Sequence, residues 1–172
     1  MNNQTVTKKT VRISLFVAIA LIMFLLESLI PPIFAFAPGA KLGLANVVSL
    51  CALILLGIID AFLVVIIRCL LASFFTGNVV ALMYSLPSSL AALTTMTILY
   101  VFVFDKISLM CISFVSALVF NFVQLCIASV VVANAHVLFM FPLMFLASAG
   151  AGIFVGLVSY YFVRHLPSSV YR

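Results

Sequence analysis

Apolar residues form long, almost unbroken runs along the chain, separated by short polar or proline-containing breaks. Residues 50–59 and 107–120, for example, are apolar on every face of a helix, whereas strands of a membrane β-barrel would alternate apolar and polar positions. A helix needs about 20 apolar residues to cross a bilayer. The pattern predicts six such spans, at residues 13–30, 42–59, 61–75, 88–104, 107–132 and 137–163.

Proline, glycine and asparagine mark the ends of these runs. Pro31 and Pro32 end the first run, because proline has no N–H and cannot continue a helix. The third run stops before the turn sequence Thr76-Gly77-Asn78. Pro87 interrupts the run at 79–104, so we expect a separate short segment before the fourth span.

The composition excludes a soluble protein. Apolar residues make up 67% of the chain and charged residues only 6%, with a mean hydropathy of +1.47. A soluble domain carries about 25% charged residues, enough to cover its surface. We therefore predict an all-α integral membrane protein, in which residues 1–172 form one domain with six transmembrane helices in a single bundle.

The basic residues predict how the bundle is oriented. Positive residues are enriched on the cytoplasmic side of membrane proteins. Six spans place the two termini on one side, which makes the head at 1–12 and the tail at 164–172 cytoplasmic parts of a cell-membrane protein. The net charge of +5 then indicates contact with anionic membrane lipids and gives no reason to expect nucleic acid. The basic residues on the N-terminal side are Lys8, Lys9, Arg12, Lys106, Arg164 and Arg172, against Lys41 on the other.

A few polar residues lie within or beside the spans, where each costs free energy. A charged side chain at mid-bilayer costs about 2.5–3.5 kcal/mol on the insertion scale, so it normally faces the bundle interior. Two readings are open: the polar residues bind a substrate, or they pair with one another and hold helices together. Asn121 and Gln124 are three residues apart and so are expected on one face. The candidate substrate-binding residues, predicted in the outer half of the bundle, are Glu27, Lys41, Asn46, Arg68, Asn121 and Gln124.

Small residues spaced by four predict where a helix is approached closely. Ser148, Gly152 and Gly156 form such a stripe in the sixth span, and Ser14 and Ala18 form a weaker one in the first. Small residues let two helices approach backbone to backbone in a membrane. Each stripe is therefore a candidate for partner docking or for internal packing.

The sequence gives no sign of an enzyme. The phosphate-binding pattern Gly-x-x-x-x-Gly-Lys-Ser/Thr is absent, and so is the dinucleotide pattern Gly-x-Gly-x-x-Gly. The acidic residues Glu27, Asp60 and Asp105 are dispersed, so they form no cluster in the sequence for a catalytic metal ion. We expect no catalytic residue, no metal site and no cofactor in this chain.

Residues 38–46, Pro-Gly-Ala-Lys-Leu-Gly-Leu-Ala-Asn, together with residues 68–77, resemble the Gx transporter family. Members of that family are often labelled heptaprenyl diphosphate synthase component I. The family is in turn similar to the substrate-binding S components of energy-coupling factor (ECF) transporters. These are six-helix proteins that capture a nutrient from outside and associate with a transmembrane coupling subunit and two ATPase subunits.

The resemblance implies an S-component-like bundle that captures a small organic nutrient. By position, Lys41 and Asn46 would border the external site, Arg68 would lie within the bundle, and Ser14 and Ala18 would dock the coupling subunit. Two alternatives are a noncatalytic membrane subunit of prenyl diphosphate or quinone synthesis, and a membrane partner in flavin-linked extracellular electron transfer.

The orientation can be tested by labelling. A single cysteine at Ala37, in a chain whose four native cysteines are replaced, should react with a membrane-impermeant thiol reagent added from outside. Labelling that occurs only after the membrane is opened would show that the bundle is inverted.

Overall fold

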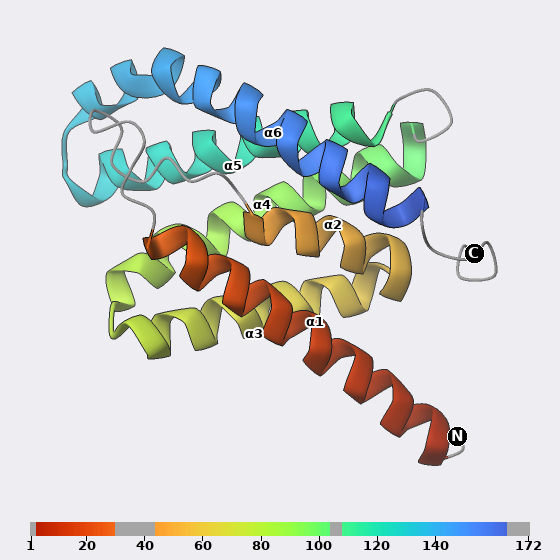
Figure 1. Ribbon diagram of the computed structural model, residues 1–172. Helices are drawn as coiled ribbons and strands as arrows, with labels where there is room; N and C mark the ends of the chain where they lie inside the picture. Colours follow the sequence, from red (N-terminus) through yellow and green to blue (C-terminus); the bar gives the residue numbers. More distant parts are fainter. Residues whose placement is uncertain (1–2, 30–43, 104–107, 165–172) are drawn as a thin grey trace.

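The computed structural model describes residues 3–29, 44–103 and 108–164, and these form helices without any strand. The all-α membrane bundle predicted from the sequence is confirmed (Figure 1). Lys41, most of the segment 38–46 and nearly all of the predicted tail lie outside the described residues. The elements are α1 Asn3–Leu29, α2 Leu44–Leu56, α3 Ile58–Thr76, α4 Val79–Val103, α5 Leu109–Val131, the 3-10 helix η1 Ala135–Met140 and α6 Phe141–Arg164.

The second helix is shorter than predicted. Five helices, α1, α3, α4, α5 and α6, are long and apolar enough to cross a membrane. The 13 residues of α2 extend only about 20 Å at 1.5 Å per residue, less than the hydrocarbon thickness of about 30 Å. The described part of the predicted span 42–59 is divided at Gly57, which ends α2, and Ile58 already belongs to α3.

Glycine forms both turns that flank α3. Gly57 alone joins α2 to α3 with φ of +92°, and Gly77 ends α3 with φ of +63°. Residues with a side chain rarely adopt such angles. Asn78 then caps α4, because its Oδ1 accepts a hydrogen bond of 3.0 Å from the N–H of Ala81. The break predicted at residues 76–78 is confirmed.

The prediction of a separate segment before Pro87 is wrong, since α4 is one helix that continues through this proline. Proline removes one backbone hydrogen bond, yet membrane helices tolerate it when nearby groups satisfy the backbone. The Ser88 hydroxyl donates a hydrogen bond of 2.6 Å to the carbonyl of Tyr84, which is one residue after the Met83 carbonyl that Pro87 leaves without a donor. Similarly, α1 begins at Asn3 and so includes most of the polar head.

The helices α5 and α6 pack backbone to backbone. A Cβ atom on Gly152 would lie 2.5 Å from Cα of Phe114, and one on Gly156 would lie 2.6 Å from Cα of Met110. Ser148, on the same stripe, is fully buried. Of the two roles left open for Ser148, Gly152 and Gly156, partner docking and internal packing, the structure favours internal packing, because α5 covers this stripe.

An ion pair marks one end of the bundle. Lys9 Nζ in α1 lies 2.8 Å from Asp60 Oδ1 in the first turn of α3, beside the α2–α3 turn. A carboxylate is favourable there because the N-terminal end of a helix carries partial positive charge. Lys9 belongs to the predicted cytoplasmic head, so the pair joins this part of α1 to the start of α3.

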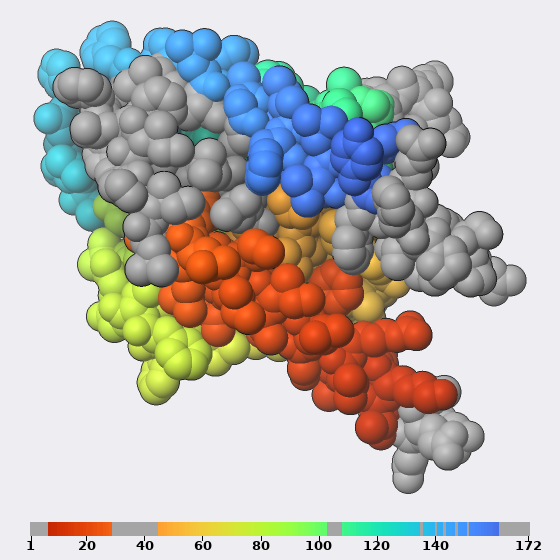
Figure 2. Space-filling view, in the orientation of Figure 1, coloured from red at the N-terminus to blue at the C-terminus, as the bar shows by residue number. Residues whose placement is uncertain are grey.

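Large apolar side chains cover the outside of the bundle. Figure 2 shows α1 and α6 on one face with α2 visible between them. On the surface of the described residues, Ile59, Phe74, Phe102 and Phe139 each expose more than two thirds of their area. Such a surface suits lipid chains, as the composition indicated.

The packing of α5 on α6 predicts unequal effects for two glycines. Gly152→Ala should destabilise the protein by about 1–3 kcal/mol, because the new methyl group meets the α5 backbone. The control Gly150→Ala should be neutral or slightly stabilising, since nothing lies within 4 Å of that position and alanine favours helices. The melting temperature of each variant can be measured in detergent with a thiol-reactive dye. The dye labels the buried thiols of Cys51 and Cys69 as the protein unfolds. Equal melting temperatures would contradict the packing.

Candidate functional site

A cavity of about 470 Å³ lies at the end of the bundle far from the Lys9–Asp60 pair. Here α1 and α5 end, α2 and α6 begin, and the α3–α4 turn closes one side. The volume falls within the range of about 300–1,000 Å³ typical of small-molecule sites. The lining is Phe24, Glu27, Ala45, Asn46, Arg68, Asn78, Val80, Ala81, Tyr84, Ser85, Ser89, Phe120, Gln124, Leu125, Ala128, Val132, Val137 and Met144.

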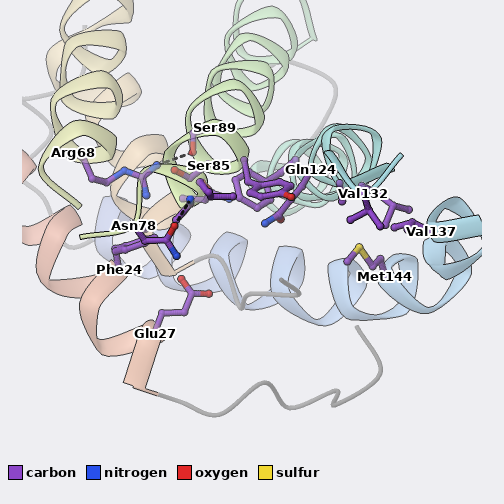
Figure 3. A pocket seen from close by; sticks show the side chains of 18 residues that line it. Phe24, Glu27, Arg68, Asn78, Ser85, Ser89, Gln124, Val132, Val137 and Met144 are labelled. Carbon is purple, nitrogen blue, oxygen red and sulfur yellow. Dashed lines mark hydrogen bonds between the residues drawn. The ribbon is translucent and has the colours of Figure 1, made fainter. Parts of the chain in front are cut away.

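Arg68, on α3, is the buried cation of this cavity. The residue is only 4% exposed, and its Nη2 donates a hydrogen bond of 2.9 Å to the hydroxyl of Ser89 on α4. Its Nε is buried and has no hydrogen-bond partner. Figure 3 shows Arg68 and Ser89 together at one side of the cavity.

Glu27 lies on the same cavity but does not pair with Arg68. It is buried near the end of α1, and its side chain stands apart from Arg68 in Figure 3. Between these two described residues there is no ion pair, so the pairing weighed from the sequence is wrong. The guanidinium donates a hydrogen bond to Ser89 instead, because α4 packs against α3 at this level.

The first turn of α2 reaches the cavity. Ala45 and Asn46, the second and third residues of this helix, are both buried and line it. Because α2 is short, its first turn lies beside Arg68 and Gln124 in one cavity. The N–H groups of a first turn have no carbonyl acceptor within their own helix. The start of the described part of α2 thus forms part of the cavity wall.

Asn121 and Gln124 have different surroundings, although both were predicted to lie on one face of the helix as substrate-binding residues. Asn121 does not line the cavity; its Nδ2 donates a hydrogen bond of 2.6 Å to Ser148 on α6. Gln124 does line it, and its buried Oε1 has no hydrogen-bond partner. The rotation between positions three apart on a helix is enough to separate the two side chains.

The other candidates lie elsewhere. Ser14 and Ala18 are exposed on α1, outside the cavity, and Lys41 lies outside the described residues. Ser85 and Ser89, four apart on α4, line the cavity but were not predicted from the sequence. Their spacing was a usable signal, but Pro87 between them had suggested a break in the helix.

The site offers binding groups rather than a reactive centre. Among the described residues, no group of three histidine, cysteine or acidic side chains could hold a metal ion. The cavity instead combines a buried cation, a carboxylate, hydroxyls and amides with an apolar wall. A mostly apolar cavity with a few polar groups is typical of small-molecule recognition.

The chain was compared with known families and proteins. The family model for heptaprenyl diphosphate synthase component I matches residues 16–162, which include all of the cavity. Comparison with curated proteins and with solved structures gave no match. The family match covers most of the chain and agrees with the resemblance seen in the sequence. The chain therefore belongs to the heptaprenyl diphosphate synthase component I family, the Gx transporter family.

Proposed function

We propose that this protein is the substrate-binding membrane subunit of an ECF-type importer and captures a small organic nutrient. The observation that carries the proposal is the cavity at one end of the bundle, lined by residues of all six α-helices and η1. A noncatalytic membrane component of this kind is compatible with the family match. The cavity supports a binding role, since a few polar side chains line one mostly apolar cavity.

The position of the cavity supports uptake from outside. Glu27 at the cavity is 18 residues along α1 from Lys9, which is about 27 Å at 1.5 Å per residue. The two features therefore lie near opposite ends of the bundle. With Lys9 on the cytoplasmic side, as the basic residues predict, the cavity is on the external side.

Energy for uptake would come from other subunits. The chain has no ATP-binding loop of the Gly-x-x-x-x-Gly-Lys-Ser/Thr type. The proposed partners are a transmembrane coupling subunit and two ATPase subunits. Ser14 and Ala18, small and exposed on α1, are the proposed docking positions for the coupling subunit, because α1 presents them on its outer surface.

A second candidate function is favoured by the family description, which names a component of heptaprenyl diphosphate synthase. In that case the chain would be a noncatalytic membrane subunit beside a soluble synthase. The dispersed acidic residues give it no diphosphate-binding centre of its own.

Co-purification from native membranes tests the proposed function. The wild-type protein should bring down a coupling subunit and ATPases, and mass spectrometry should detect a retained small molecule. Ala18→Leu should reduce the recovery of these subunits several-fold, because the added side chain blocks close approach at the docking face. The control Gly150→Leu introduces the same leucine side chain at an exposed position of α6 and should not reduce the recovery. Recovery of an aspartate-rich prenyl synthase without ATPases would favour the second candidate instead.

A further inference from the structure

We propose, building on the capture function above, that the substrate is an amphipathic organic anion whose carboxylate or phosphate binds between Arg68 and the first turn of α2. Both features line the same cavity. The inference names the chemical class of the substrate, which the family match does not give.

The first observation is the unused hydrogen-bonding capacity of Arg68. A guanidinium has five N–H donors and keeps its charge when buried. The protein satisfies Nη2 through Ser89, whereas Nε is buried without a partner. A hydroxyl is neutral and cannot balance the charge. An anionic oxygen in the cavity would do so and would accept from the planar edge of the guanidinium.

The second observation is the end of α2. Its first turn contributes Ala45 and Asn46 to the cavity wall, and a helix N-terminus carries about half a positive charge. Helices that begin inside a membrane bundle commonly direct this end at the anionic group of a substrate. The dipole and the guanidinium favour the same ligand charge, and each is strengthened by the low dielectric around the cavity.

The opposite wall defines the rest of the substrate. Figure 3 shows Val132, Val137 and Met144 on the side away from Arg68 and Ser89. These side chains come from the end of α5, η1 and α6, and they are apolar. Gln124 lies between the two sides, and its buried Oε1 can accept a hydrogen bond from an N–H or O–H of the substrate. The cavity is thus polar at one end and apolar at the other.

Glu27 is the one feature of the cavity that would favour a cation. Glu27 takes part in an interaction in the structure, whereas Nε of Arg68 is buried without a hydrogen-bond partner. Since Glu27 and Arg68 do not pair, the two charges can be tested separately.

Three probes with the same apolar body and different head groups test the inference. Purified full-length protein is titrated with 4-phenylbutyrate, 4-phenylbutyl phosphate or 4-phenylbutylamine, and the melting temperature is followed to obtain a Kd. At least one anionic probe should stabilise the protein in a saturable way, and the amine should not. The stronger of the two anions identifies the preferred head group as carboxylate or phosphate.

Variants connect probe binding to the residues. Arg68→Gln should abolish the response to the anions, and Arg68→Lys should weaken it by about tenfold or more, because the charge is kept but the fork of donors is lost. Glu27→Gln should tighten anion binding, because it removes a negative charge from the cavity wall. Asn121→Ala controls for stability: it should lower the melting temperature through loss of the Ser148 contact but leave the Kd of the probe as it was.

The outcomes separate this inference from the proposed function. Saturable binding of the amine that is lost in Glu27→Gln would overturn the anion site but leave ligand capture intact. Anion binding that survives in Arg68→Gln and Arg68→Lys would likewise overturn it. A wild-type protein that responds to no probe and retains no small molecule after purification would overturn both proposals.

Discussion

A guanidinium buried inside an apolar bundle must find its hydrogen-bond acceptors within the protein, because the surrounding hydrocarbon supplies none. Arg68 is in this position, and the arrangement of the neighbouring helices follows from it. Helix α4 passes unbroken through Pro87 and so brings Ser89 against the guanidinium. The described part of helix α2 begins at Leu44, and Ala45 and Asn46 line the cavity together with Arg68. Residues of α2 and α4 thus line the cavity beside the charged side chain of Arg68.

The cavity is lined from every part of one continuous bundle. The main apolar core contains residues of α1, α2, α3, α4 and the start of α5, with residues such as Val64 and Val65 fully buried. The pair α5 and α6 is held further by close backbone contact at Gly152 and Gly156. Most of the polar lining residues come from α1–α4, whereas Val132, Val137 and Met144 come from the end of α5, η1 and α6. The two sides of the cavity therefore differ because different helices reach them.

The sequence was sufficient for the fold because length and apolarity decide what crosses a membrane. It placed the turn at residues 76–78 through glycine and asparagine, and it selected Arg68, Glu27, Asn46 and Gln124, which line the cavity. It failed where the result depends on neighbours in space. The turn at Gly57 ends α2, Asn121 donates a hydrogen bond to Ser148, and α5 covers the glycine stripe. None of these contacts leaves a pattern in the sequence that separates it from its alternative.

The single glycine between α2 and α3 also bears on how the protein is made. With only Gly57 between them, the two helices leave the ribosome almost together. The 13 described residues of α2 extend about 20 Å, less than the hydrocarbon thickness of about 30 Å. Entry of α2 and α3 into the bilayer as one hairpin would let the 19 residues of α3 supply apolar length beside the shorter α2.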